Sequence, residues 1–466
     1  MAGIGFELRT LSNQHSIASP LVSLAHATWV SSGPLILTAV GLLTVQLLTS
    51  DRAGAFEITL FRVSLTYASM LALISASPTA VIVTRLVADC SYDRNYDDIP
   101  TLLIGALSLA ALVTGITGAA FWSMQFALPP DVAISAWALS QSIALLWATT
   151  VFSGTLKDYV GVTEAFLAGI IVLAGAAAVL AQCRMDAAGM TWCMSAGNMT
   201  TSIWLAARAS VSLPSKPADP FLGVRNICRG FSRFPLLAIG VAAGTTGIWA
   251  DKWVMWSSHA GTTVVSGLVY APLYDSAMFM SFLVVVPALA AFIIHVETGL
   301  YTNLTRFLDL VLQNGTLEEI QAAADRLSLL IRSSVLHLFI VQAAVSVCAI
   351  LALPLIVQTF GMQFRQIPIM RLGLLGSVFH LLFLLCCSVL LFINRQRAFC
   401  ALQVLFLAFN GAATWAFLQL GPDYAGMGYF TAAVCCGLTS YFWLDRTLRD
   451  LVYLTFASAI SASARE

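Results

Sequence analysis

The chain contains about twelve separate apolar runs, and this feature restricts its fold more than any other. Each run reaches or approaches the roughly 20 residues that a helix needs to cross a bilayer. Only 10% of the 466 residues are charged, against about 25% in soluble domains, so too little charge is present to cover a water-facing surface. We therefore expect an all-α membrane protein of about twelve transmembrane helices. The runs begin near Leu21, Ile58, Thr101, Ala133, Gly161, Gly189, Phe234, Val264, Ser334, Arg371, Ala398 and Ala425.

The distribution of Lys and Arg predicts how these helices are oriented. Both residue types are enriched in the cytoplasmic loops of membrane proteins. If the N-terminus is cytoplasmic, nearly all Lys and Arg in the loops fall on the cytoplasmic side, and those on the opposite side are Arg52, Arg184, Arg365 and Arg371. We therefore expect a multi-pass protein of the bacterial inner membrane with both termini in the cytoplasm.

A basic stretch near the middle of the chain separates two groups of predicted helices. Residues 208–233 contain three prolines and five basic residues, which is typical of a linker rather than a span. We expect this cytoplasmic linker to join two six-helix lobes, formed by residues 1–207 and 234–466.

The second lobe includes a predicted cytoplasmic helical segment at residues 297–332. Thr316 and Glu319 have the spacing of a capping box, just after the turn residues Asn314 and Gly315. Such a helix lies on the membrane surface, receives a cytoplasmic partner, or packs against its own bundle. The residues predicted to share one face are Leu317, Ile320, Ala324, Leu327 and Ile331.

Helix-breaking residues predict kinked or interrupted helices in both halves. Broken helices at matching positions are typical of secondary transporters, although membrane helices tolerate Gly and Pro in general. The candidate hinge positions lie in the first, second and eighth predicted spans and are Gly33, Pro34, Pro78, Pro272 and Pro287.

Ionisable side chains within spans are candidates for a transport path, because each costs roughly 2.5 to 3.5 kcal/mol at the bilayer centre. Asp275 lies near the middle of the eighth predicted span, among apolar residues and close to Tyr270 and Tyr274. Two interpretations remain open for this aspartate: a position in a transport cavity, or a structural pair with Arg62 or Lys252.

Asp251 and Lys252 lie near the outer end of the seventh predicted span. The nearby residues Trp249, Trp253 and Trp256 have the i, i+4, i+7 spacing of an interfacial aromatic belt. The two charges therefore belong either to a transport path or to the level of the lipid headgroups. The candidate transport-path residues are Asp275, Asp251, Lys252, Arg62, Tyr270 and Tyr274.

No motif predicts an enzyme, a metal site or a bound cofactor. The ten cysteines form no C-x-x-C pair, and none of the three lysines lies in a glycine-rich phosphate loop. The longest predicted loops are too short for a catalytic domain, and no nucleophile-base pattern is present. The formal net charge of 0 gives no indication of nucleic-acid binding.

Several short motifs resemble the Pel exopolysaccharide transporter (PelG) family. They cover residues 1 to about 300, and the number of predicted spans fits the family over the whole chain. The motifs are MAGIGFELR at residues 1–9, TRLVAD at 84–89 followed by Tyr92 and Tyr96, GIWADKW at 247–253, and YDSAMF at 274–279 followed by VET at 296–298.

This resemblance implies the fold of the multidrug, oligosaccharide-lipid and polysaccharide (MOP) exporter superfamily, in which two six-helix lobes enclose a cavity that opens alternately to each side. It also implies export of an amino-sugar polysaccharide. The implied partners are a cytoplasmic glycosyltransferase that uses a UDP-sugar, and membrane subunits, one of which senses cyclic-di-GMP. Such a polymer is partly deacetylated and carries ammonium groups, which Asp251 and Asp275 would attract while Tyr270 and Tyr274 stack on sugar rings.

Three alternatives remain open. The first is a drug or lipid-linked oligosaccharide exporter of the same fold, since fold does not determine substrate. The second is a major-facilitator transporter, but the mostly acidic loop at residues 88–98 lacks that family's glycine-Asp-Arg signature. The third is a scaffold that assembles a polysaccharide synthase without transporting anything.

Overall fold

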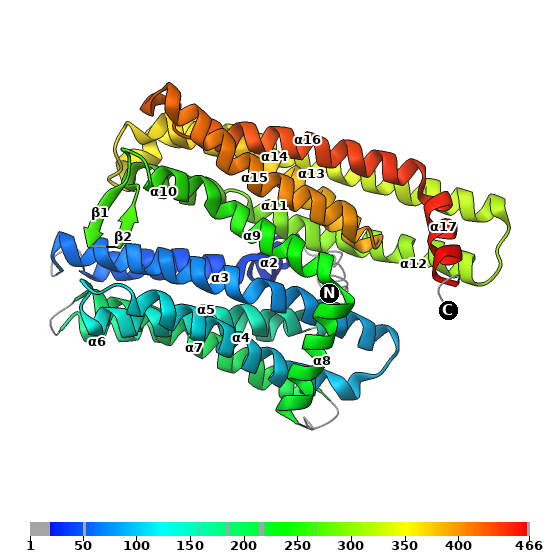
Figure 1. Ribbon diagram of the computed structural model, residues 1–466, viewed down its shortest axis with the longest axis horizontal. Helices are drawn as coiled ribbons and strands as arrows, with labels where there is room; N and C mark the ends of the chain where they lie inside the picture. Colours follow the sequence, from blue (N-terminus) through cyan, green and yellow to red (C-terminus); the bar gives the residue numbers. More distant parts are fainter. Residues whose placement is uncertain are drawn as a thin grey trace. The chain divides into compact units, whose positions relative to one another are not determined.

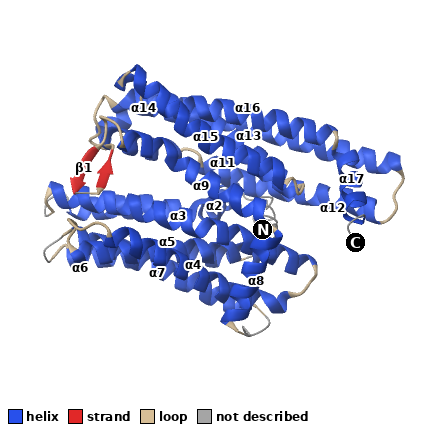
Figure 2. Cartoon of the chain, in the orientation of Figure 1, coloured by secondary structure: helices blue, strands red, loops and turns tan. Residues whose placement is uncertain are grey.

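The computed structural model describes residues 19–49, 53–156, 158–182, 186–213, 219–265 and 267–463. Helices make up nearly all of this part of the chain, and a short β-hairpin is its one sheet (Figures 1 and 2). Several features used in the sequence analysis lie outside the described residues: the motif at residues 1–9, Arg52, Arg184 and residues 214–218 of the linker.

The helices alternate with short turns along the chain. Their bounds are α2 Ser19–Thr49, α3 Ala55–Tyr92, α4 Ile99–Ser123, α5 Pro130–Leu156, α6 Tyr159–Leu180, α7 Ala187–Ser212, α8 Pro220–Arg233, α9 Pro235–Trp256, α10 Pro272–Leu283, α11 Val286–Ala291, α12 Thr298–Leu312, α13 Leu317–Thr359, α14 Gln366–Phe392, α15 Gln396–Leu420, α16 Met427–Arg449 and α17 Leu451–Ser463. Short 3-10 turns occupy Tyr96–Asp98 and Pro422–Tyr424, and a π-helical turn occupies Phe292–Glu297.

The number of membrane spans agrees with an all-α, multi-pass membrane protein. Among the described residues, nine helical segments are long and apolar enough to cross a bilayer, and the bent pair α8–α9 makes ten. The two other predicted runs form α7 and α16, which are helical but fall short of this apolarity. Polar residues explain the shortfall, such as Asn198 in α7 and the Thr, Ser and Tyr residues of α16.

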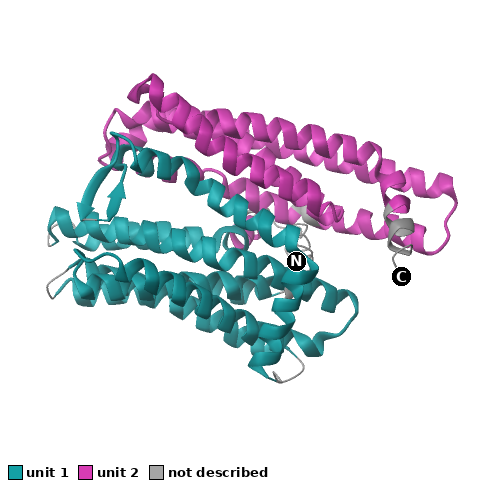
Figure 3. Ribbon diagram, in the orientation of Figure 1, with its two compact units in different colours: residues 1, 3, 28–275 teal, residues 2, 4–27, 276–466 magenta. Residues whose placement is uncertain are grey.

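Residues 28–275 form one compact unit, and residues 19–27 with 276–463 form a second (Figure 3). Helix α9 belongs to the first unit because it packs against α3, where the Ser77 and Thr245 hydroxyls lie 2.9 Å apart. The sequence predicts instead that α9 belongs to the C-terminal lobe. The division into two functional six-helix lobes at residues 208–233 stays a prediction.

In the first unit, α7 packs against α5 and α6 through small residues. A Cβ atom on Gly169 would lie 2.8 Å from the carbonyl oxygen of Gly197, so the two backbones are in close contact. Small residues allow such close packing where no hydrophobic effect drives helices together in lipid. In the second unit, α14 packs against α16, and α13 against α14.

Helix α13 joins two features that the sequence analysis treats separately. The predicted cytoplasmic helix after Thr316 and the span beginning near Ser334 form one helix of 43 residues. At 1.5 Å per residue it is about 64 Å long, roughly twice the thickness of the hydrocarbon core. The capping box is confirmed, because the side chains of Thr316 and Glu319 each bond the other residue's backbone N–H.

The outer surface of α13 indicates where this helix leaves the membrane. Its exposed side carries Glu318, Asp325 and Arg326 in the first three turns, and from Leu329 onward it carries exposed apolar residues. The predicted inner face is buried except at its first residue, Leu317, which is 66% exposed. The segment therefore packs against its own bundle. The exposed apolar residues are Leu329, Leu336, Ile340, Val347, Leu351 and Leu355.

The residues that are predicted to break helices occupy different kinds of position in the structure. Helix α2 is kinked at Ser32, which has non-helical backbone angles, directly before Gly33 and Pro34. Helix α3 remains continuous through Pro78. Pro272 is the first residue of α10 rather than a break within it, and Pro287 follows the interruption between α10 and α11. Their action as hinges stays a prediction.

The prediction that a span begins near Val264 is wrong by about eight residues. Strands β1 (Thr262–Val265) and β2 (Leu268–Tyr270) form an antiparallel hairpin between α9 and α10. Gly267, in the connecting turn, has a φ of +91°, a conformation that a residue with a side chain rarely adopts. Apolar β-branched residues fit a strand as well as a membrane helix, which explains the error.

Candidate functional site

The candidate residues on α9 lie in its last two turns and are buried inside the protein. Asp251 is fully buried and Lys252 is 7% exposed. Two small residues on the same helix, Gly244 and Gly247, are also buried. Of the three tryptophans of the predicted belt, Trp256 is buried and Trp253 is 38% exposed.

Asp251, Lys252 and Tyr274 form one buried cluster. The Tyr274 hydroxyl donates a hydrogen bond of 2.6 Å to Asp251 Oδ2, and Lys252 Nζ lies 3.5 Å from the same oxygen. Lys252 Nζ also donates to the carbonyl oxygen of Ile248 at 3.0 Å and lies 5.5 Å from the Trp249 ring centre. The buried aspartate is therefore balanced by a cation and a hydroxyl, as a buried charge requires.

Asp275 lies next to this cluster, one residue after Tyr274. Its Oδ2 atom accepts hydrogen bonds from Trp256 Nε1 and from the backbone N–H of Ala271, both at 2.9 Å. Its Oδ1 atom is buried and has no hydrogen-bond partner in the part of the chain that the structure describes. A buried carboxylate oxygen without a protein partner is open to a water, an ion or a bound group.

A tyrosine from α3 fixes the hairpin that connects these residues. The Tyr67 hydroxyl donates to the carbonyl oxygen of Val269 at 2.8 Å and accepts from the Val269 N–H at 3.2 Å. Its ring stacks on Trp256 and Phe121, with centroid distances of 4.8 and 5.5 Å. The end of α9, the hairpin and the start of α10 are thus held together by side chains from three helices.

The structure does not bring Arg62 to Asp275, so this proposed ion pair is wrong. Arg62 Nη2 instead donates to Gln46 Oε1 at 2.6 Å, on an exposed part of α3. Arg62 is close enough to the half-buried Tyr270 to interact with it electrostatically. The other proposed partner, Lys252, is within electrostatic range of Asp275 but pairs with Asp251.

Tyr67 and Trp256 contribute to this site, and the sequence alone does not predict either contribution. Tyr67 lies in an apolar run with no local pattern that indicates a partner about 200 residues away. The spacing of Trp256 predicts a place in an aromatic belt, whereas its indole N–H donates a hydrogen bond to Asp275. Among the described residues, no group of three or more His, Cys, Asp or Glu has a metal-binding arrangement. The chemistry available here is recognition of a cation or a hydrogen-bond donor by Asp275 Oδ1.

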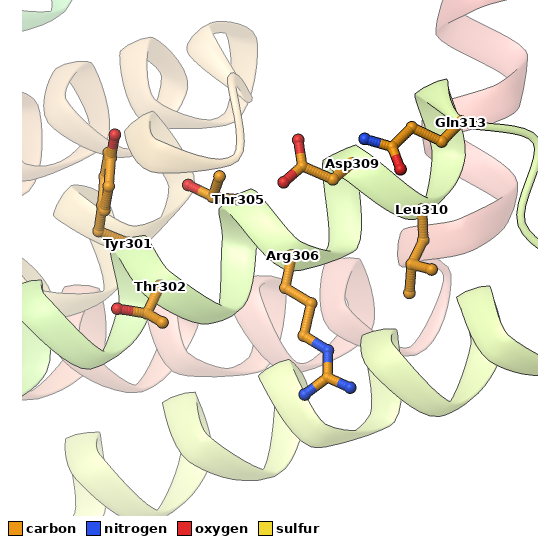
Figure 4. Close-up of a pocket in the computed structure, with 7 residues that line it drawn as sticks. All are labelled: Tyr301, Thr302, Thr305, Arg306, Asp309, Leu310 and Gln313. Atoms are coloured by element: carbon orange, nitrogen blue, oxygen red, sulfur yellow. The ribbon is translucent and has the colours of Figure 1, made fainter.

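The second unit carries a separate polar groove along α12 (Figure 4). The groove is shallow, with a volume of about 370 Å³. Arg306 and Asp309 extend to different sides of the helix (Figure 4). The residues lining the groove are Tyr301, Thr302, Thr305, Arg306, Asp309, Leu310 and Gln313.

The fold is similar to solved transporters of the MOP superfamily. One is a MOP superfamily transporter from Pyrococcus furiosus, with a TM-score of 0.63, 14% identity, and coverage of 91% of this chain and 96% of that one. A second, a MATE protein in its bent conformation, has a TM-score of 0.63, 13% identity and coverage of 97% and 99%. A third, an outward-facing multidrug resistance MATE transporter, has a TM-score of 0.61, 13% identity and coverage of 92% and 96%.

The sequence comparisons are more specific about the family. No curated protein matches this sequence. Residues 1–456 match the PelG family, whose description is "Putative exopolysaccharide Exporter (EPS-E)". The match spans nearly the whole chain, including both the cluster around Asp251 and the groove on α12. The chain therefore belongs to the PelG family of exopolysaccharide exporters and has the fold of MOP superfamily transporters.

Proposed function

We propose that this protein exports a Pel-type amino-sugar polysaccharide across the bacterial inner membrane, and that Asp275 contacts the polymer. The observation that carries the proposal is the unpartnered, buried Oδ1 atom of Asp275 within a membrane-spanning unit. A partly deacetylated amino sugar carries ammonium groups, which pair with carboxylates. Tyr270, which is half-buried, and Trp253, which is partly exposed, supply ring faces suited to sugar rings.

Asp251 and Lys252 have a different role in this proposal. They neutralise each other at 3.5 Å, so Asp275 carries the uncompensated charge of the site. The Asp251–Lys252 pair and Tyr274 then hold the connection from α9 through the hairpin to α10, so that Asp275 faces the polymer. Arg62, bonded to Gln46 outside this cluster, would act as a boundary that repels the cationic polymer.

We propose that the polymer moves by alternating access between two lobes, or that a synthase complex makes the polymer and feeds it into this protein. Kinking at Gly33 and Pro34, and the interruption before Pro287, supply flexible points of the kind that transporters use. Pro78 and Pro272 complete the proposed hinge positions. No nucleic acid, cofactor or enzymatic step is part of this mechanism.

The proposed partners are a cytoplasmic glycosyltransferase and membrane subunits, one of which senses cyclic-di-GMP. The end of α13 that extends beyond the membrane is a suitable docking element for the glycosyltransferase. Its first turns carry Glu318, Asp325 and Arg326, and α12 contributes the polar groove beside them. A scaffold that only assembles the synthase would use the same surface, and this surface is the observation that favours that second candidate.

The test compares secreted amino-sugar polymer from cells that lack this protein and are rescued by wild type, Asp275→Asn or Asp251→Asn. Asparagine keeps the size of Asp275 and one oxygen for Trp256 and Ala271, but it removes the charge. Asp423→Asn is a matched control, because Asp423 is exposed in the turn before α16. Protein level and co-purification of the partners are measured in parallel.

We expect Asp275→Asn to assemble normally and to lower secretion at least tenfold, the effect of losing about 1.4 kcal/mol of cation binding. The Asp423→Asn control should secrete as wild type does. Normal secretion by Asp275→Asn at equal protein level would contradict the proposed transport path. Loss of partner co-purification together with secretion would favour the scaffold.

A further inference from the structure

Helix α8 joins α9 at a bend of 90°, and this bend determines how α8 lies relative to the membrane. Although α9 reaches the apolarity of a span only together with α8, its 22 residues give a length of about 33 Å, which matches the hydrocarbon core of a bilayer. If α9 crosses the membrane, α8 lies along its surface. Figure 1 shows α8 running across α3 and α4 within the first unit.

One side of α8 is fixed by glycine contacts. A Cβ atom on Gly223 would lie 2.2 Å from the carbonyl oxygen of Thr101 in α4, and one on Gly230 would lie 2.7 Å from Ile82 in α3. Gly105 of α4 faces Gly223 in the same contact. Only glycine permits so close an approach, so the rotation of α8 about its own axis is set by this packing.

The two remaining sides of α8 differ in polarity. Because successive residues advance by about 100°, Val224 and Phe231 share one side, next to Ile227, and Arg225 and Arg229 share another side, about 130° further round the helix. Ile227 is buried against the bundle, whereas Val224 and Phe231 are half-buried. Arg225 and Arg229 are exposed. This division is that of an amphipathic helix at a membrane surface, with apolar residues toward the acyl chains and arginines at the level of the headgroups.

The two arginines are not neutralised by the protein. Among the residues that the structure describes, neither Arg225 nor Arg229 forms a salt bridge with an acidic side chain. The acidic residue that does reach α8, Asp89 of α3, is occupied by Arg85 at 3.2 Å and by Arg233 at 3.8 Å. Two adjacent, solvated guanidinium groups one helical turn apart are complementary to an anionic phosphate.

We propose that Arg225 and Arg229 form a binding site for the phosphate groups of anionic phospholipids, with Val224 and Phe231 facing the acyl chains. The site depends on membrane insertion of α9 and not on the identity of the exported polymer. Each arginine near an anionic lipid surface contributes a factor of about five in affinity, so the pair contributes roughly 30-fold.

The test uses the purified full-length protein in neutral detergent. Phosphatidylglycerol or phosphatidylcholine is titrated in, and the number of lipids that remain bound is measured by native mass spectrometry. The variants are R225Q/R229Q, the charge-conserving R225K/R229K, and the control R365Q/R371Q, which makes the same change in charge at two exposed arginines at the start of α14. Inorganic phosphate is added in a competition arm.

We expect wild type to retain phosphatidylglycerol in preference to phosphatidylcholine, R225Q/R229Q to bind it roughly 30-fold more weakly, and the other two variants to bind it nearly as wild type does. Equal retention by wild type and R225Q/R229Q would overturn the proposal. So would displacement of the lipid by millimolar inorganic phosphate, which would identify a site for free phosphate instead. Because lipid binding is measured without export, failure here leaves the proposed transport function untouched.

Discussion

The hydrogen bond from Tyr274 to Asp251 provides the sharpest test of the buried cluster. Tyr274→Phe removes one hydroxyl and leaves the ring, which is 1% exposed, in place. The donor and acceptor oxygens are 2.6 Å apart, within the range of charge-assisted O–H···O⁻ bonds. A hydrogen bond to a charged group contributes about 1.5 to 3 kcal/mol in soluble proteins. Measured values between membrane helices average about 0.6 and reach about 1.7 kcal/mol.

We expect Tyr274→Phe to lower the free energy of unfolding by about 1.5 kcal/mol, near the top of the membrane range. The value should not be larger, because Asp251 keeps Lys252 at 3.5 Å. Such a loss corresponds to a roughly tenfold change in the unfolding equilibrium. The measurement is equilibrium unfolding in mixed detergent micelles with increasing sodium dodecyl sulfate, monitored by tryptophan fluorescence.

Tyr453→Phe is the matched control, because Tyr453 on α17 is 73% exposed and should contribute almost nothing. Combining Tyr274→Phe with Asp251→Asn completes a double-mutant cycle that isolates the coupling between the two side chains. A loss for Tyr274→Phe that equals the control, or a coupling energy near zero, would refute the reasoning that this bond stabilises the α9–hairpin–α10 connection.

Three further outcomes follow from the packing of individual residues. Gly223→Ala should lower the thermal midpoint in detergent, because overpacking costs about 1 to 3 kcal/mol of stability. The control Gly175→Ala should be neutral or stabilising, because a Cβ atom there would meet nothing within 4 Å. Equal effects of the two variants would contradict the close contact of α8. Tyr67→Phe should raise amide hydrogen exchange across residues 262–270, and unchanged exchange would show that the hydroxyl does not hold the hairpin. Thr316→Ala should cost about 0.5 to 2 kcal/mol and raise exchange in the first turn of α13, while Thr316→Ser should preserve the protection.

Sequence reasoning succeeded where the determining contacts are local. The capping box at Thr316 involves residues three positions apart, so its spacing is sufficient to predict it. The apolar positions after it were assigned to one face, and four of the five are buried. The continuous helix through Ser334 was not predicted, although no Gly or Pro lies between Leu317 and that residue. A membrane boundary changes the polarity of a helix without ending it, and this boundary was mistaken for the start of a new element.

The candidate site was only partly predictable because its geometry depends on distant segments. Asp251, Lys252 and Tyr274 were identified from their residue types, and the hairpin then places Tyr274 against Asp251. That hairpin is encoded by an apolar β-branched stretch that local periodicity cannot distinguish from a membrane helix. A pair between Arg62 and Asp275 is one of the alternatives that the charges of these residues leave open, whereas Arg62 bonds the amide oxygen of Gln46 on the neighbouring helix.

The uninterrupted length of α13 has a mechanical consequence. The first proline or glycine among its 43 residues is Pro354. The helix is therefore expected to move as a rigid rod where it crosses the membrane boundary. A tilt of about 5° imposed at its capped end displaces the other end by about 6 Å, more than one helical turn. A force applied at Thr316 would therefore be transmitted along α13 to its other end without any change in the fold between the two points.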